Sequence, residues 1–162
     1  MEIRKTRMEE LDRLMDIYAN ARAFMARTGN PHQWGDGNYP DRALIESDIA
    51  AGHSYVLVEG EEILATYFLA EGPDPCYSVM LEGAWLDEEP YVVIHRIASS
   101  GTRRGAASHC IEQAVRQYGN LRIDTHDDNL PMQRALERLG FTRCGRIPFE
   151  DGTRITYHRH DR

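Results

Sequence analysis

The chain has few cysteines and lacks long apolar runs. Its 162 residues include three cysteines, an odd number without zinc-like spacing, so we expect reduced thiols rather than disulfides or a metal site. No apolar stretch approaches the roughly 20 residues that a membrane-spanning helix needs, and the charged start precedes no apolar signal segment. These absences predict a cytoplasmic protein with no membrane partner.

A surplus of positive charge is also missing. The chain carries 19 Lys and Arg residues against 26 Asp and Glu residues, a formal net charge of −7. Nucleic-acid binding requires a basic face that displaces counterions, so this balance argues against a nucleic-acid partner. The length is ordinary for one domain with a hydrophobic core, and we expect a single domain over residues 1–162.

A basic, glycine-containing turn joins an apolar run to a helical pattern. Residues 91–97 form the apolar run, and the turn and the first helical residues read Thr102-Arg103-Arg104-Gly105-Ala106-Ala107-Ser108. Backbone N–H groups at a helix start lack intrahelical partners, and together with the helix dipole and two arginines they suit phosphate groups. The small residues let a ligand approach the backbone. The turn therefore predicts a diphosphate-binding site.

The composition of the turn narrows the choice of diphosphate. It lacks the lysine and Ser/Thr of a nucleotide P-loop and the G-x-G-x-x-G of a dinucleotide fold. It resembles the acetyl-coenzyme A signature Q/R-x-x-G-x-G/A of the GNAT superfamily of N-acetyltransferases. Gly105 and Ala107 match the glycine and the final small residue of that signature, while Thr102 stands where Gln or Arg is usual.

The residues after this turn resemble the second half of the same signature. A strand pattern over residues 121–125 is followed by Asn129 and by a helix that ends in Leu139-Gly140-Phe141. The resemblance covers the whole chain and is specific between residues 91 and 145. It implies an acetyl-coenzyme A-dependent N-acetyltransferase.

Hydrophobic periodicity predicts alternating strands and helices. We expect strands at residues 3–5, 54–59, 63–70, 91–97, 121–125, 141–147 and 154–160, with a further crossing segment near 77–81 and a final hairpin turn at Asp151-Gly152. Thr6 and Glu9 predict a capping box before a helix that ends at Gly29, and further helices are expected at residues 41–51, 106–118 and 130–139. The predicted fold is α/β (α+β), with about four helices and a mixed, mostly antiparallel sheet. The resemblance implies that the fourth and fifth strands, 91–97 and 121–125, splay apart.

The resemblance also implies where acetyl-coenzyme A binds. Backbone groups of Ile97, Ala98 and Ser99 would hold the pantetheine and face the thioester carbonyl. The pyrophosphate would lie on the N–H groups of Arg103, Arg104, Gly105, Ala106, Ala107 and Ser108. Asn129 matches the family asparagine beside the pantetheine and is equally a candidate helix cap. Arg138 is a candidate coenzyme contact or a solvated charge on the last helix.

The general acid and base do not follow the family pattern closely. Many relatives have a tyrosine acid five residues before the phenylalanine of the Gly-Phe ending, where this chain has Leu136. Strand alternation predicts that Tyr91, Val93, His95 and Ile97 share one face. Tyr91 takes the place of a glutamate that is the base in some relatives, and a histidine titrates near neutral pH, which makes His95 the first candidate base. The alternative for His95 is a hydrogen-bonded core histidine, and His126 is the second candidate.

Three aromatic residues lie in loops, namely Trp34, Tyr39 and Trp85. They are candidates for the wall of an amine-binding pocket through cation–π contacts, or they cover the core. The acidic residues between 124 and 128 match no metal-ligand motif, and we expect an exposed pair at His158 and His160, so we predict no metal site.

The sequence thus predicts acetyl transfer from acetyl-coenzyme A to a small-molecule or peptide amine. Transfer would be direct, in a ternary complex, because Ser99 and Ser100 lack a nucleophile elbow and Cys110 falls in the apolar stripe of a helix. The main alternative is a non-catalytic sensor that binds acyl-coenzyme A. A homodimer is compatible with either function.

Overall fold

The computed structural model describes residues 1–34, 39–150 and 152–162, and its centre is one eight-stranded sheet. The strand order is β1-β2-β3-β5-β6-β8-β7-β4, and every neighbouring pair is antiparallel except β5 and β6. The strands are β1 Glu2–Lys5, β2 Ser54–Glu59, β3 Glu62–Glu71, β4 Glu82–Gly83, β5 Val92–Ser99, β6 Asn120–Thr125, β7 Thr142–Phe149 and β8 Gly152–His160. The predicted mixed, mostly antiparallel sheet is confirmed.

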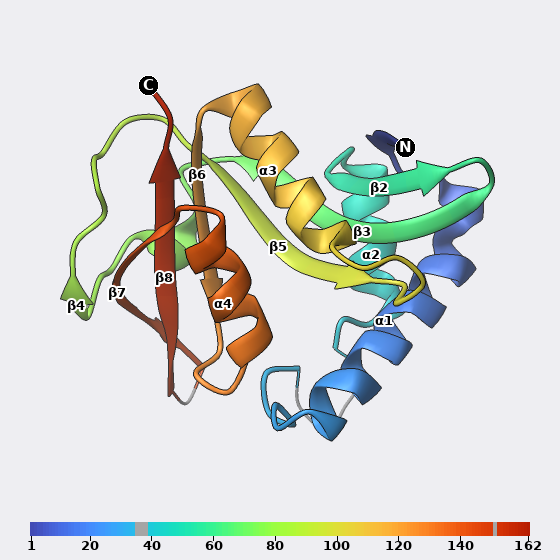
Figure 1. Cartoon of the computed structure of the whole chain (residues 1–162), viewed down its shortest axis with the longest axis horizontal. Helices are drawn as coiled ribbons and strands as arrows, with labels where there is room; N and C mark the ends of the chain where they lie inside the picture. The colour runs from blue at the N-terminus through green and yellow to red at the C-terminus, as the bar shows by residue number, and fades with distance from the viewer. Residues whose placement is uncertain (35–38, 151) are drawn as a thin grey trace.

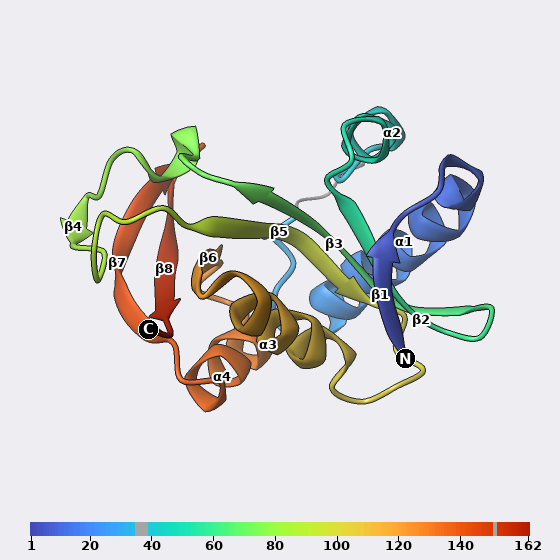
Figure 2. The ribbon, with the colours of Figure 1, turned by 90° about the horizontal axis from the view of Figure 1, so that it is seen from above.

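Four α-helices among the described residues cover the two faces of this sheet. Helices α1 (Leu11–Arg27) and α2 (Arg42–Ala50) lie on one face, and α3 (Ala106–Tyr118) and α4 (Leu130–Arg138) lie on the other, as Figures 1 and 2 show. Side-chain alternation along β2 creates the two cores: Leu57 packs on the α3 and α4 side, whereas Val56 packs on the α1 and α2 side. No helix in the described ranges is both long and apolar enough to cross a membrane.

Local side-chain chemistry sets the helix starts, with one difference from prediction. Asp41 caps α2 by accepting from the Leu44 N–H at 2.8 Å. The predicted capping box of Thr6 and Glu9 is wrong, because a 3₁₀ turn precedes α1 and moves the helix start. Glu10 accepts from the Arg7 N–H at 2.8 Å instead, and the Thr6 hydroxyl bonds that of Ser54 at 2.8 Å.

The predicted crossing segment at residues 77–81 is also wrong. A 3₁₀ turn, Pro75–Tyr77, occupies its start, because Asp74 accepts from the Cys76 N–H at 2.8 Å and Pro75 fixes the first position. The strand at this edge is the two-residue β4, which pairs with β7, and the flanking Leu81 N–H donates to the Arg146 carbonyl at 2.8 Å. Because β4 adds one short strand, the strands predicted as fourth and fifth, residues 91–97 and 121–125, correspond to β5 and β6. The predicted hairpin between β7 and β8 is confirmed, although Asp151 of its turn lies outside the described residues.

Strand β5 is bulged where it parts from β6. Across the described residues the parallel ladder has two pairs, Val92 with Leu121 and Val93 with Arg122, and beyond them the strands diverge. On the β3 side the register shifts after His95, and Arg96 adopts a positive φ of 52°. The extra residue turns Ile97 to the α3 and α4 face, so the predicted common face of Tyr91, Val93, His95 and Ile97 is wrong at Ile97.

Candidate active site

A cavity of about 150 Å³ opens where β5 and β6 diverge. Its walls come from the end of α1, the bulged part of β5, the end of β6, the start of α4 and the neighbouring ends of β7 and β8. His95 and Ile97 of β5 line it opposite Asp124 and Thr125 of β6. The bulge and the divergence together therefore place polar side chains and free strand edges around one space.

His95 lies between two carboxylates in this cavity. Its Nε2 atom is 2.8 Å from Asp74 Oδ2, and its Nδ1 atom is 3.8 Å from Asp124 Oδ2. Burial raises the pKa of Asp74, but the hydrogen bonds from His95 and the Cys76 N–H outweigh it and hold that pKa below its usual value. Asp74 is therefore ionised near neutral pH and orients the imidazole, with Nε2–H donating to it. The Nδ1 lone pair is left to take a proton from a ligand in the cavity.

Asp124 has a fixed position because Tyr77 donates a hydrogen bond to it. The Tyr77 hydroxyl lies 2.7 Å from Asp124 Oδ2, and its ring packs 5.8 Å from the His95 ring. Asp74, Tyr77 and Asp124 were not among the site residues expected from sequence. The only sequence signal for Asp74 was its place in a proline-rich loop, which indicates a turn and says nothing about its partner.

A buried ion pair fixes the bulge. Arg96 donates from Nε and Nη2 to the two carboxylate oxygens of Asp48, each at 3.0 Å, and its carbonyl accepts from the Tyr18 hydroxyl at 2.8 Å. Burial raises the pKa of Asp48, and the Arg96 charge opposes that rise. A positive φ is strained for arginine, so the ion pair and the tyrosine hold a conformation that an isolated strand would avoid. The signal that could have identified Arg96 was a charge inside an apolar strand.

The basic turn follows the C-terminal end of β5, just beyond the bulge. Arg103 forms an ion pair with Glu59, and the Thr102 hydroxyl donates to Glu62 at 2.7 Å, so the turn rests on the hairpin between β2 and β3. Gly105 has φ of +79°, and a Cβ added there would enter open space. The first helical N–H groups, those of Ala106, Ala107 and Ser108, precede the first α-helical bond, from His109 N to Gly105 O.

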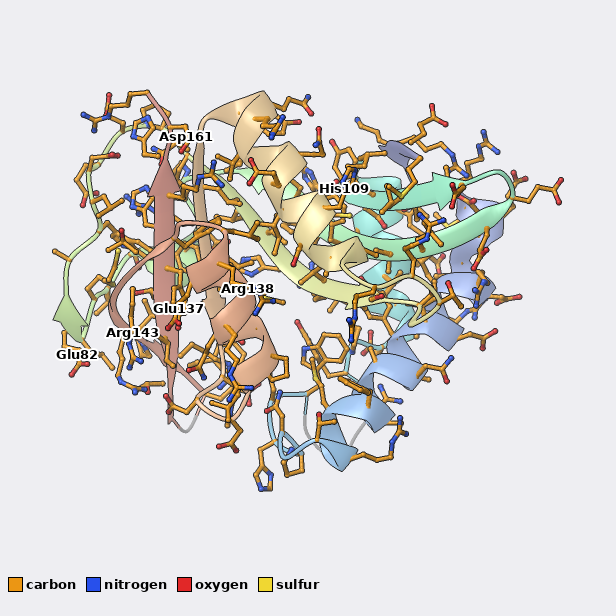
Figure 3. The ribbon with its side chains drawn as sticks, viewed as in Figure 1. Glu82, His109, Glu137, Arg138, Arg143 and Asp161 are labelled. Atoms are coloured by element: carbon orange, nitrogen blue, oxygen red, sulfur yellow. The ribbon has the colours of Figure 1, made fainter. Side chains whose placement is uncertain are left out.

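Two further candidate coenzyme contacts lie on α4. Asn129 caps that helix by accepting from the Met132 N–H at 3.2 Å, and its amide donates to Gln33 at 2.8 Å while it lines the cavity. Figure 3 shows Arg138 on the side of α4 that faces α3. Leu136, at the position of the family tyrosine, is completely buried in the core, as is Cys110, whose pKa burial raises to about 12.

The other candidate catalytic residues lie outside the cavity wall. The Tyr91 hydroxyl accepts from the Asp74 N–H at 2.9 Å, and its ring lies beneath the Arg122 guanidinium. His126 Nδ1 accepts from the Asp128 N–H at 2.9 Å, so it stabilises the turn after β6. Through its hydrogen bond with the Asp74 N–H, Tyr91 positions the loop that carries Asp74.

The three loop aromatics are divided between two places. Trp34 and Tyr39 line the cavity and pack edge to face, with ring centroids 6.3 Å apart. Trp85 is buried in a separate cluster, 5.0 Å from the Tyr77 ring and beneath Arg122, and is not part of the cavity wall. The expectation that all three aromatic residues line one pocket is therefore wrong for Trp85, which packs with Tyr77 and Ile147 instead.

The sequence predicted no metal site. In the structure, arginines pair with the acidic residues of two charged clusters, one around Asp127 and one around Asp87. Asp127 pairs with Arg146 at 2.8 Å. Asp87, Glu89 and His160 approach one another closely, but Arg162 donates to both carboxylates, at 3.0 and 2.8 Å. The expected exposure of His158 is wrong: it is completely buried on β8, where it pairs with the Asn120 side chain at 2.5 Å.

Comparison with known proteins agrees with this geometry. The family model described as the acetyltransferase (GNAT) family matches residues 11–141. A GNAT-family acetyltransferase structure from Streptococcus agalactiae 2603 is 32% identical, covers 99% of this chain and 95% of its own, and superposes with a TM-score of 0.91. No curated protein matches the chain.

More distant structures share the fold alone. A GNAT-family acetyltransferase from Listeria monocytogenes 4b F2365 is 16% identical over 98% of this chain and 94% of its own, with a TM-score of 0.70. A Drosophila melanogaster polyamine N-acetyltransferase that forms N-acetylagmatine is 12% identical over 98% and 99%, with a TM-score of 0.60. The fold is that of GNAT-family acetyltransferases. The chain belongs to the GNAT acetyltransferase family, a membership that implies acyl transfer from an acyl-coenzyme A.

Proposed function

We propose that this protein transfers an acetyl group from acetyl-coenzyme A to a primary amine, by direct attack in a ternary complex. The observation that carries the proposal is the Asp74–His95 pair, whose imidazole lines the cavity between the diverging strands. A sensor that only binds acyl-coenzyme A has no need of a histidine held in one tautomer by an ionised carboxylate.

The donor fits the chain's own groups at the C-terminal end of β5 and in the turn that follows it. The turn before α3 offers unpaired N–H groups and two arginines for the pyrophosphate, and the backbone from Ile97 to Ser99 borders the gap for the pantetheine. Asn129 lies across this gap at the start of α4. These placements support acetyl-coenzyme A as the donor.

The amine has to lose a proton as it attacks the thioester. The C–N bond forms at the acetyl carbonyl carbon, the C–S bond breaks, and the electron pair of that bond leaves with the sulfur. His95 Nδ1 accepts the proton of the amine, and the Asp74 carboxylate stabilises the imidazolium that results. Because Leu136 has no proton to give, the thiolate takes its proton from solvent or from His95. A free thiol of pKa near 8.5 is a tolerable leaving group under either route.

The test is release of free thiol from acetyl-coenzyme A in the presence of a panel of primary amines. We expect His95→Gln to lower kcat about 10²- to 10⁴-fold and to leave acetyl-coenzyme A affinity unchanged, because only the proton transfer is removed. Asp74→Asn should lower kcat less, because the imidazole keeps its proton-accepting nitrogen and loses only the carboxylate that orients it. His109→Gln, on α3 and outside the cavity wall (Figure 3), is the matched control. Binding of acetyl-coenzyme A without thiol release for any amine would favour the sensor.

A further inference from the structure

The cavity is lined by both acidic and basic side chains. Asp124 and His95 line the cavity, with Asp74 hydrogen-bonded to His95, and Arg154 of β8 lines it too. Arg154 is only 8% exposed, which is unusual for an arginine without a structural ion pair. This side chain has no role in the acetyl-transfer chemistry described above.

Arg154 is bound by neutral groups in the described part of the chain. Its guanidinium donates to the Gln33 carbonyl at 3.2 Å and to the Thr153 carbonyl at 3.4 Å, and it stacks 4.0 Å above the Phe149 ring. No described carboxylate lies within ion-pair distance of it. Burial lowers the pKa of Arg154, the sign of a positive charge that its surroundings do not fully compensate. The planar fork therefore has donors to spare for an anion.

A second polar group of the cavity lining lacks a protein partner among the described residues. The Thr125 side chain is 1% exposed and lines the cavity, and its hydroxyl makes no hydrogen bond within the described residues. Buried hydroxyls are normally paired, so an unpaired one in the cavity lining points to a polar ligand. Both groups can bind a ligand anion without breaking an existing ion pair.

The ladder of β6 and β8 brings the acidic and the basic residue close together on one face of the sheet. In the ladder of β6 and β8, Asp124 is opposite Thr156, which makes Arg154 its diagonal neighbour two residues along β8. The backbone positions of diagonal neighbours lie about 7–8 Å apart, and their side chains are within reach of one another. A ligand with an amine and an anion a few bonds apart can therefore reach both charges at once.

We propose that the acceptor is a small amine that also carries a carboxylate, of the amino-acid class, with its amine at His95 and Asp124 and its carboxylate on the Arg154 fork. This substrate class rests on the proposed acetyl transfer. Guanidinium binds carboxylate in two parallel hydrogen bonds, which lysine cannot reproduce. The same charge repels polyamines and agmatine, so this chain differs in acceptor from the polyamine enzymes that share its fold.

The first experiment compares thiol release with matched acceptors: the free amino acids, their carboxamides, and spermidine and agmatine. We expect kcat/KM for at least one amino acid to exceed that of its carboxamide about 10- to 100-fold, the effect of a hydrogen-bonded charge pair. Arg154→Gln should remove this preference and leave acetyl-coenzyme A affinity unchanged, and Arg154→Lys should restore part of it. Arg143→Gln, an exposed arginine on β7 (Figure 3), is the control and should keep the preference. Equal rates for acids and amides, or a preference for polyamines, would overturn the proposed class.

The second experiment tests the anion site without requiring turnover. N-acetyl amino acids and their carboxamides serve as product-like probes at millimolar concentration, and the shift in melting temperature is measured for the wild type and Arg154→Gln. We expect the acids to stabilise the wild type alone. If the acids stabilise it while no amine is acetylated, the anion site stands and the proposed function fails. If amines are acetylated without regard to a carboxylate and the acids give no shift, the proposed function stands and the substrate class fails.

Discussion

The basic turn and the bulge in β5 each contain an arginine paired with a carboxylate, but the two pairs differ in exposure. The side chains of Arg103 and Glu59 are 45% and 47% exposed, whereas those of Arg96 and Asp48 are 12% and 8% exposed. Water solvates Arg103 and Glu59 whether or not they are paired. Arg103 can therefore exchange Glu59 for a ligand phosphate at a small cost in free energy. The second pair cannot open without leaving a charge in the interior. The exposed arginine suits binding, and the buried one suits positioning.

The largest effect should follow from breaking the buried pair. We expect Asp48→Ala to lower the free energy of unfolding by about 3 kcal/mol or more, because it leaves the Arg96 guanidinium buried without its carboxylate. Glu59→Ala should change it by less than about 1 kcal/mol. Urea unfolding of both variants measures the difference. Similar small losses in both would show that exposure does not distinguish the two pairs.

A second buried polar pair should make stability depend on pH. His158 donates from Nε2 to Asn120 and accepts from the Leu86 N–H at 3.1 Å through Nδ1, which requires the neutral imidazole. Burial, assisted by the Arg122 charge, lowers the pKa of His158 to about 4. The unfolded chain, with a histidine pKa near 6.5, then binds more protons than the folded chain as the pH falls below 6.5.

Stability from His158 is therefore complete above pH 6.5 and is lost progressively as the pH falls toward 4. We expect a loss of about 2 kcal/mol between pH 8 and pH 5, measured by urea unfolding, and a flatter profile in His158→Gln. In NMR titration, the His158 ring signals of the folded protein should stay constant down to about pH 5. Titration of that ring near pH 6.5 would contradict this account.

A smaller effect is expected at the exposed pair. Glu59 competes with the ligand for Arg103, so Glu59→Gln should tighten acetyl-coenzyme A binding about two- to fivefold at low salt. The gain should disappear at high ionic strength, since exposed charges are screened within a Debye length of about 3 Å at 1 M salt. Isothermal titration at two salt concentrations checks both points. Glu61→Gln, in the turn of the same hairpin, is the control for loss of one negative charge. An unchanged affinity in Glu59→Gln would mean that Arg103 does not contact the coenzyme.

The part of the molecule that sequence predicted best is local along the chain. The turn before α3, the glycine at its start and the following helix occupy consecutive residues, so periodicity and the signature of the turn place them together. The sequence also predicted that β5 and β6 are parallel, because a helix that connects two strands of one sheet forms a right-handed crossover. The pairing of these strands over two residues alone confirms the splay that the resemblance implied.

The cavity wall could not be predicted in the same way, because its residues come from distant segments. Asp74 reaches His95 across 21 positions, and Asp48 reaches Arg96 across 48. No spacing rule connects such pairs, and strand alternation failed at Arg96 because a bulge adds a residue without any glycine to mark it. Arg154 was expected on a strand but not in the cavity, since that requires the register of β6 with β8.

The smallest effect is expected at a buried hydroxyl without a partner. Tyr157 is completely buried on β8, and its hydroxyl makes no hydrogen bond in the part of the chain that the structure describes. Tyr157→Phe removes that hydroxyl and leaves no partner behind, so the free energy of unfolding should be unchanged or slightly higher, within about 1 kcal/mol. Asn120→Ala is the matched change at a polar group with a partner, and it should destabilise by about 1–3 kcal/mol because the His158 N–H loses its acceptor. Both measurements use urea unfolding at pH 8, where His158 is neutral. Equal losses in the two variants would mean that burial alone sets the cost of a polar deletion, and that a buried partner left without its hydrogen bond adds nothing to it.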